Sequence, residues 1–159
     1  GKVLLRTPRL LTPTHNAGDI EFGNDGYLYL TIGDSGNDKE KVAQDLNTLL
    51  GKFIRIKDDG GIPSSNPYTG SDSESCASDG DTSSNKKCRE IFAYGLRNPF
   101  RMAKDPNTQD DRFFINDVGG AHWEEINEAG DGYKGVNYGY PPWEGPCQRK
   151  TFEGCEEDS

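Results

Sequence analysis

The sequence has no long hydrophobic run, and no stretch approaches the roughly 20 consecutive apolar residues that a membrane-spanning helix needs. It is also short of basic charge, because 18 Lys and Arg face 27 Asp and Glu and leave a net charge of −9. Nucleic acids and anionic membrane surfaces are polyanions, so this charge argues against either as a partner. A neutral or cationic ligand fits the composition better.

A signal peptide is missing as well. The chain begins with GKVLLRTPRLL, which has neither the initiating Met nor the apolar core and cleavage site of a leader. We therefore expect an excised or internal segment, for which the missing leader says nothing about the whole protein. The length fits one domain or part of one, so residues 1–159 are interpreted as a segment of a single domain.

Large aliphatic residues and Phe are scarce: Leu, Ile, Val and Phe together make up 29 of 159 residues, at the edge of the disordered class. Between Lys57 and Glu90, however, only Ile62 belongs to this group, so the rest of the chain can build a thin core. Ser, Asp, Gly and Asn dominate residues 61–90. This composition predicts a long, solvent-exposed insert loop within the domain.

Four cysteines allow three complete pairings. A zinc site is less well supported, since neither sequential pair has the short spacing of zinc ligands and no His lies nearby. Free thiols are the remaining alternative. We favour Cys76 with Cys88 and Cys147 with Cys155, because each pair closes a short loop of polar sequence, as in secreted proteins. The sequence thus predicts an extracellular or secretory-pathway protein.

Short apolar runs broken by Gly, Asp, Asn and Pro indicate an all-β protein. The predicted strands cover residues 27–32, 53–56, 90–94 and 112–116. A single short helix is predicted from about Val42 to Leu50, where Val42, Leu46, Leu49 and Leu50 fall on one face.

Two units of the chain resemble each other: DGYLYLTIGDSG and DDRFFINDVGG each run from an acidic turn through an aromatic strand into Asp and then Gly. Their wide spacing suggests a radial repeat such as a β-propeller, whose blades are usually four-stranded sheets of about 40 to 50 residues. The polar insert would account for the extra length. A β-sandwich with coincidental turns is the alternative.

A family resemblance rests on several motifs in a fixed order, between about residues 14 and 146: HNAGDIEFGNDGYLYLTIGDSG, AQDLNTLLGKFIRI, EIFAYGLRNPFRM, FINDVGGAHWEEIN and GVNYGYPPWEG. Together they resemble the soluble quinoprotein glucose, sorbosone and aldose sugar dehydrogenases, and also the propeller of the Hedgehog-interacting-protein-like proteins. The resemblance implies a six-bladed β-propeller that binds pyrroloquinoline quinone (PQQ) at the channel mouth, with Ca²⁺ beside it. About half of the blades would lie in this chain, and the remaining blades of the parent propeller would be its partners.

The resemblance also implies catalytic roles. His15 matches the general base that takes the proton of the hydroxyl on the anomeric carbon of the sugar while hydride passes to the quinone. Asp34 matches the carboxylate that orients and polarises this histidine. Arg97 and Asn98 match the pair that faces the quinone, with the guanidinium near the oxygen that gains charge. This assignment agrees with the chemistry, since hydride loss needs a base and a fixed cation stabilises the charge that develops.

Metal ligands follow from the same resemblance. The backbone carbonyls of Gly119 and Gly120 match ligands of the quinone-bound Ca²⁺, whereas Glu125 and Tyr138 match ligands of a second Ca²⁺. Ca²⁺ prefers hard oxygen ligands, including main-chain carbonyls. His122 has no matching role and is predicted to lie on the surface.

Each of these residues also has a structural explanation. His15 suits a turn, Gly33-Asp34-Ser35-Gly36 is favourable turn chemistry, and Asn98 before Pro favours a turn. The glycine pair could serve only to turn the chain, and Glu124 with Glu125 could be a solvated pair.

Three positions depart from the best-known members of the family. Thr14 and Lys39 stand where the glucose enzymes have a sugar-contacting Asp and a Gln, and Val118 replaces a Gln before the glycine pair. The identity of the sugar is therefore open. The basic residues that grip the quinone carboxylates in the family lie beyond residue 159, so we do not expect this segment alone to hold the cofactor. Two functions stay in competition: oxidation of an aldose, and a non-catalytic extracellular module that binds a protein or glycan partner.

Overall fold

The computed structural model describes residues 1–8, 12–16, 18–36, 41–82 and 85–148. Within these ranges the chain forms β-strands and no helix, which confirms the all-β prediction. The number of blades stays a prediction. All four predicted strands are present, as β2 (Leu28–Ile32), β3 (Lys52–Ile56), β6 (Ile91–Tyr94) and β8 (Arg112–Asp117).

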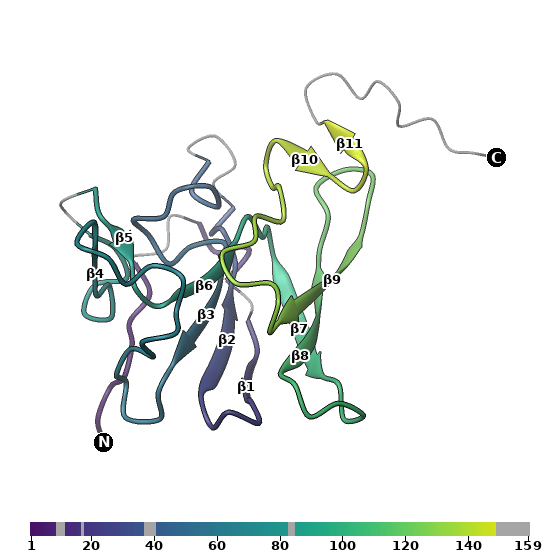
Figure 1. The fold of residues 1–159 in the computed structure, drawn as a ribbon. Helices are drawn as coiled ribbons and strands as arrows, with labels where there is room; N and C mark the ends of the chain where they lie inside the picture. The colour runs from purple at the N-terminus through teal and green to yellow at the C-terminus, as the bar shows by residue number, and fades with distance from the viewer. Residues whose placement is uncertain (9–11, 17, 37–40, 83–84, 149–159) are drawn as a thin grey trace.

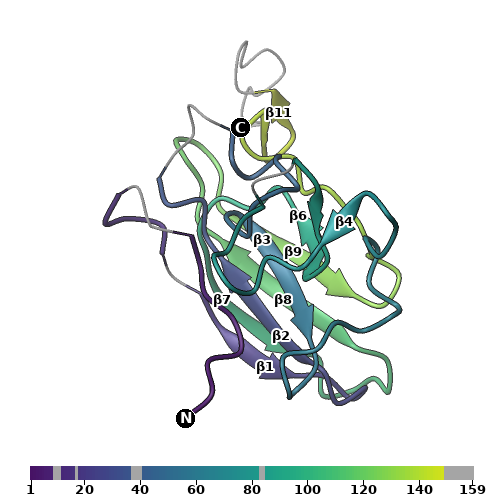
Figure 2. The same ribbon diagram turned by 90° about the vertical axis from the view of Figure 1, so that its left-hand side faces the viewer.

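Two antiparallel sheets make up most of the fold (Figure 1). The first has the order β1-β2-β3-β6, with bounds Ile20–Phe22, Leu28–Ile32, Lys52–Ile56 and Ile91–Tyr94. The second has the order β7-β8-β9, with bounds Pro99–Lys104, Arg112–Asp117 and Glu125–Gly130. Turned by 90°, the long strands of both sheets run along a similar direction (Figure 2). The loops at one end of these sheets hold most of the predicted site residues.

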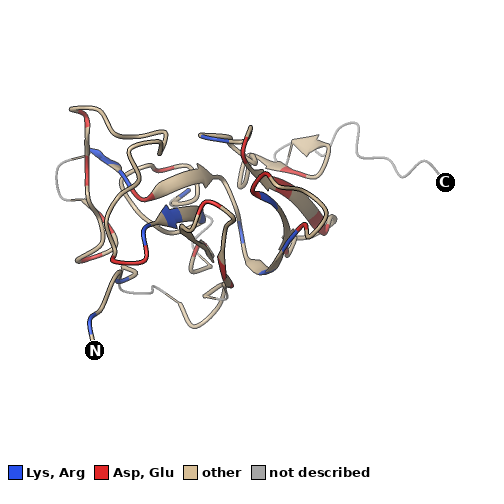
Figure 3. Ribbon diagram, turned by 60° about the horizontal axis from the view of Figure 1, so that its bottom comes forward, with Lys and Arg blue, Asp and Glu red and all other residues tan. Residues whose placement is uncertain are grey.

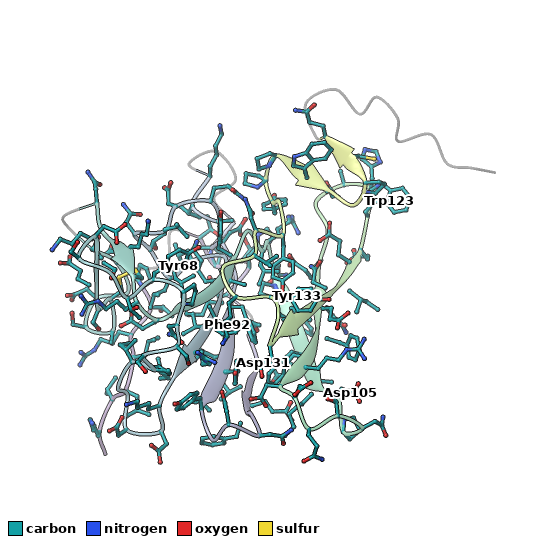
Figure 4. All side chains as sticks on the ribbon, in the orientation of Figure 1. Tyr68, Phe92, Asp105, Trp123, Asp131 and Tyr133 are labelled. Atoms are coloured by element: carbon teal, nitrogen blue, oxygen red, sulfur yellow. A yellow bond between two sulfur atoms is a disulfide. The ribbon has the colours of Figure 1, made fainter. Side chains whose placement is uncertain are left out.

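An aromatic cluster packs between the two sheets. Tyr29, Phe53, Phe92 and Phe113 are fully buried, and the ring centroids of Tyr29 and Phe113 lie 4.6 Å apart. Phe92 is labelled near the centre of the molecule (Figure 4). Contacts of this kind contribute beyond the area that they bury, so a chain poor in aliphatic residues still obtains a core. A second apolar cluster lies on the other face of the first sheet and includes Ile54, Ile56 and Ile91.

The polar segment 61–90 is more ordered than the sequence predicts. It contains a short parallel pair, β4 (Ser73–Glu74) with β5 (Lys87–Cys88), and its residues Cys76 and Cys88 are fully buried. The segment therefore has buried positions that its composition does not indicate, and its description as a solvent-exposed insert loop stays a prediction. The disulfide and polar hydrogen bonds hold the segment in place. For example, the Asn66 side chain donates to the carbonyls of Arg55 and Arg89. Because these interactions are not apolar, the apolar content of the segment does not indicate its burial.

Cys76 and Cys88 form a disulfide bond, as predicted. Their sulfurs are thus not thiolates available to zinc, although the Glu90 carboxylate lies close by and accepts a hydrogen bond from the Cys76 N–H at 3.0 Å. Cys147 is also disulfide-bonded. Its predicted partner, Cys155, lies outside the described residues.

The predicted helix over residues 42–50 is wrong. The chain forms turns from Lys41 to Gln44, and the backbone groups that a helix would use are bonded to the polar segment instead. The Leu49 N–H donates to the carbonyl of Gly80 at 2.8 Å, and the Asn47 carbonyl accepts from the Thr82 N–H at 2.8 Å. The apolar side chains at 42, 49 and 50 are still buried, so the hydrophobic pattern was informative about burial but not about conformation.

Charged residues are spread over both sheets and their loops (Figure 3). Among the described residues, none lies in a helix with the length and apolar character that crossing a membrane requires.

Candidate active site

His15 and Asp34 are in direct contact, as the sequence analysis predicts. Nδ1 of His15 lies 2.7 Å from Oδ1 of Asp34, and the same oxygen accepts a hydrogen bond from the Gly36 N–H at 2.8 Å. Asp34 is 1% exposed, whereas 17% of the His15 side chain is exposed. A carboxylate at Nδ1 fixes the ring and leaves the other nitrogen free to act as a base.

The local backbone is shaped for this contact. Strand β2 ends at Ile32, so Asp34 follows directly after it, and His15 has a φ of +54°, which non-glycine residues rarely adopt. A Cβ on Gly33 would lie 2.0 Å from the carbonyl oxygen of His15. Only glycine therefore lets the histidine loop approach the end of β2 so closely. Strain of this kind often marks a functional site.

Arg97 and Asn98 follow β6 and lie beside this pair. The Asp34 N–H donates to the Arg97 carbonyl at 2.8 Å. The Asp117 carboxylate accepts from the N–H groups of Arg97 and Asn98, at 2.8 and 2.6 Å. Burial raises the pKa of Asp117 to about 7; these two hydrogen bonds oppose the rise, and the negative charges of Glu125 and Asp34 add to it.

The Arg97 guanidinium reaches the glycine pair. Its Nη1 donates to the carbonyls of Val118 and Gly119, at 2.9 and 2.7 Å. Its Nε donates to the Tyr140 hydroxyl at 3.2 Å. A side-chain cation thus contacts one of the two carbonyls predicted to bind Ca²⁺. The side-chain oxygen of Asn98 is buried without a hydrogen-bond partner in the described part of the chain, and it could accept a bond from a ligand.

Glu144 organises the loop that follows β8, and the sequence analysis missed it. It lies in β10 (Trp143–Glu144), which pairs with β11 (Cys147–Gln148). Its Oε1 accepts hydrogen bonds from four successive N–H groups at 2.7 to 3.1 Å, namely those of Gly120, Ala121, His122 and Trp123. Successive amides of this kind form an anion-binding concavity, called a nest.

The electrostatics of Glu144 follow from this nest. Burial would raise the pKa of its carboxyl, but the four hydrogen bonds outweigh burial and lower the pKa to about 2.

Trp123 lies at the end of the second sheet, beside β10 and β11 (Figure 4). His122 is exposed, as predicted.

The two residues predicted to bind the second Ca²⁺ make hydrogen bonds to different partners. Glu125 accepts from the Gly145 N–H at 2.6 Å, and the Tyr138 hydroxyl donates to the Glu128 carbonyl at 2.7 Å. Burial raises the pKa of Tyr138, which keeps its hydroxyl protonated. Between residues 12 and 148, no described contact joins Glu125 to Tyr138.

A cavity of about 350 Å³ has the carboxylates of Asp117, Glu124 and Glu125 in its lining, together with the apolar Val118 and Ile126. A neighbouring cavity of about 170 Å³ is lined by residues 119–124, including both glycines. Carboxylate and carbonyl oxygens suit Ca²⁺ chemically, and Arg97 with Asn98 offers a cation and an amide to an anionic quinone. The donor set fits both groups, and Arg97 donates to the Gly119 carbonyl.

Of the positions that depart from the family, Thr14 lies next to His15, and its hydroxyl is 2.9 Å from that of Thr12. Lys39 lies outside the described residues.

Solved structures of sugar dehydrogenases share this fold. A glucose dehydrogenase matches 88% of this chain over 35% of its own, with a TM-score of 0.71 and 28% sequence identity. The PQQ-bound aldose sugar dehydrogenase from Streptomyces coelicolor matches 82% of this chain over 31% of its own, with a TM-score of 0.61 and 32% identity. The fold is therefore one that this chain shares with sugar dehydrogenases.

The chain belongs to the glucose/sorbosone dehydrogenase family, whose model matches residues 2–151. Aldose sugar dehydrogenase YliI from Escherichia coli is 36% identical over 139 residues, which are 87% of this chain and 32% of that protein. The HIPL1 protein from Arabidopsis thaliana is 38% identical over 139 residues, 84% of this chain and 19% of that protein. The chain thus spans about a third or less of the length of these relatives.

Proposed function

We propose that this chain forms part of a PQQ-dependent dehydrogenase that oxidises an aldose at its anomeric carbon. The observation that carries the proposal is the buried Asp34 carboxylate 2.7 Å from the His15 imidazole, with the Arg97 backbone directly beside it. The loops that carry the base and the arginine are thus joined by a backbone hydrogen bond, and the family membership of the chain supplies the reaction class.

The chain's own residues would divide the work as follows. Asp34 holds the proton on Nδ1 of His15, so Nε2 presents a lone pair to the hydroxyl on the anomeric carbon. When Nε2 takes the hydroxyl proton, the carboxylate stabilises the imidazolium that forms. Arg97 offers positive charge where negative charge develops on the hydride acceptor. PQQ, when bound, supplies the redox chemistry by accepting the hydride.

Cofactor contacts are part of the proposal. Arg97 and Asn98 would face the quinone, and the unpartnered Asn98 oxygen supports this role. The Gly119 and Gly120 carbonyls would bind one Ca²⁺, and Glu125 with Tyr138 would bind a second. A PQQ-bound relative of this chain supports the quinone. The three carboxylates in the lining of the cavity beside Glu125 support a cation.

A second candidate is an extracellular module that binds a protein or glycan partner without catalysis. The resemblance to HIPL1 and the buried disulfide of the polar segment favour it. Both candidates place the protein outside the cell or in the secretory pathway, where disulfides persist.

The full-length protein, loaded with PQQ and CaCl₂, should reduce a dye when given an aldose. His15→Ala should lower kcat at least 100-fold, since a general base contributes about 10²–10⁴-fold. His122→Ala, which changes an exposed histidine, is the matched control and should keep wild-type turnover. Tight quinone binding without turnover on any aldose, or turnover unaffected by His15→Ala, would refute the catalytic role. Absence of quinone binding would favour the extracellular module.

A further inference from the structure

The side chain of Arg97 uses only part of its hydrogen-bonding capacity on the protein. A guanidinium group carries five N–H donors in a fixed plane. Nε donates to the Tyr140 hydroxyl at 3.2 Å, and Nη1 donates to the carbonyls of Val118 and Gly119, at 2.9 and 2.7 Å. In the part of the chain that the structure describes, Nη2 has no hydrogen-bond acceptor. Both of its N–H groups are thus left for a ligand, and the contacts of Nε and Nη1 decide where they point.

The backbone of Arg97 is fixed on both sides. Its N–H donates to the Asp117 carboxylate at 2.8 Å, and its carbonyl accepts from the Asp34 N–H at 2.8 Å. A fixed backbone still leaves a long side chain with several rotamers, and holding one of them costs conformational entropy. Contacts to the guanidinium itself are therefore needed to give the cation one position.

Tyr140 is distant from Arg97 in the sequence, yet it is anchored to the same loop. The Tyr140 N–H donates to the carbonyl of Gly95, two residues before Arg97, at 3.0 Å. Its carbonyl accepts from Nε2 of Gln44 at 2.5 Å. Only 5% of Tyr140 is exposed. The hydroxyl therefore has a fixed place relative to the backbone that carries the guanidinium.

The close fit at Gly95 supports this anchoring. Gly95 has a φ of +82°, and a Cβ there would meet the side-chain oxygen of Asn137 and lie 2.8 Å from the backbone nitrogen of Gly139. Because such close backbone packing allows little adjustment, the segment that leads to Tyr140 is held against the loop after β6.

The Tyr140 side chain offers the guanidinium two different contacts. The ring centroid lies 5.8 Å from the guanidinium carbon, at the outer limit of a cation–π contact. The hydroxyl oxygen accepts from a charged donor, and hydrogen bonds of this kind are stronger than those between neutral groups. The hydroxyl is thus the part of Tyr140 that decides the orientation of Nε.

We propose that Tyr140 is a positioning residue for Arg97, whose hydroxyl fixes the plane of the guanidinium so that Nη2 presents both N–H groups to an oxygen of the ligand that carries or gains negative charge. The Val118 and Gly119 carbonyls hold Nη1, and Tyr140 holds Nε, so the group cannot turn about a single contact. The link to catalysis rests on the proposed function; the hold on Arg97 does not.

The test compares Tyr140→Phe with Tyr133→Phe in the full-length protein with ¹⁵N-labelled arginine. Tyr140→Phe keeps the ring and removes the hydroxyl, whereas the matched control removes a hydroxyl that bonds to Glu128. The Nε–H signal of Arg97, assigned by its loss in Arg97→Lys, should exchange with water at least about tenfold faster in Tyr140→Phe, since a hydrogen bond of a charged group is lost. It should exchange as in the wild type in Tyr133→Phe. An unchanged rate in folded Tyr140→Phe would overturn the proposal.

Turnover separates positioning from a general loss of structure. With PQQ, CaCl₂ and an aldose, Tyr140→Phe should lower kcat about tenfold and leave the KM for the aldose within about twofold, because the cation acts on charge that develops in the transition state. Tyr133→Phe should keep wild-type turnover. In a protein that oxidises aldose, a wild-type kcat in Tyr140→Phe, or a rise in KM alone, would overturn the proposal.

A measurement on the wild type covers the case in which Tyr140→Phe does not fold. The Nε–H of Arg97 should exchange at least about tenfold more slowly than that of Arg101, which is exposed. Equal rates would overturn the proposal. Neither exchange measurement needs sugar or quinone. If the exchange rates are as expected in a protein that oxidises no aldose, the hold on Arg97 stands and the proposed function fails.

Discussion

Replacing Glu144 by Gln should destabilise the protein in a pH-dependent manner. In the folded protein the four N–H groups of the nest hold the carboxyl pKa at about 2, against 4.5 for the free side chain. That difference corresponds to about 3 kcal/mol in the free energy of unfolding at neutral pH. Because the folded pKa is the lower one, this stability is present above about pH 4.5 and is lost as the pH falls towards 2.

The glutamine side chain of this variant would still offer an oxygen to the nest, but hydrogen bonds to a neutral acceptor are about half as strong. We therefore expect Glu144→Gln to lower the free energy of unfolding by about 1.5–3 kcal/mol at pH 7 and by much less at pH 2.5, measured by urea denaturation of the full-length protein. Glu124→Gln is the control, since Glu124 is exposed and accepts only from the Gly119 N–H among the described contacts. An equal loss at both pH values would refute the reasoning, because it would show that shape and not charge holds the loop.

Two further predictions concern the fold around the site. Gly33→Ala should cost at least about 2 kcal/mol of stability and lower kcat, because the added Cβ would meet the His15 carbonyl oxygen at 2.0 Å; wild-type melting and turnover would contradict the geometry. Replacing Cys76 and Cys88 together by Ser should lower the free energy of unfolding by about 2–4 kcal/mol, and reducing the wild-type protein should cost the same amount. A melting curve of the wild type that does not change with reductant would show that the buried disulfide does not stabilise the fold.

Local signals made part of this structure predictable. Turn residues bounded the strands, and the alternation in Phe53-Ile54-Arg55-Ile56 matches β3. The contact between His15 and Asp34 came from motif resemblance, and not from any physical rule that brings residues 19 apart together. The Cys76–Cys88 pairing followed from the short polar loop between the two residues.

Interactions distant in sequence were the ones that could not be predicted. The segment around Asn47 and Leu49 has a helical hydrophobic pattern, yet its backbone bonds to residues 80–82, so tertiary pairing overrode local preference. Glu144 is one acidic residue among 27 Asp and Glu, and only the structure reveals the four amides that face it. Lys52 falls in an alternating strand pattern that gives no sign of a buried charge.

The contact of Arg97 with the Gly119 carbonyl bears on how the loop after β8 reaches its folded shape. A loop whose carbonyls were left to repel one another would need the metal before it could close. In this chain the Arg97 guanidinium donates to these carbonyls, so the loop can fold without a metal ion. The loop after β8 can therefore close on the charge of the polypeptide itself, before any group of the proposed function binds.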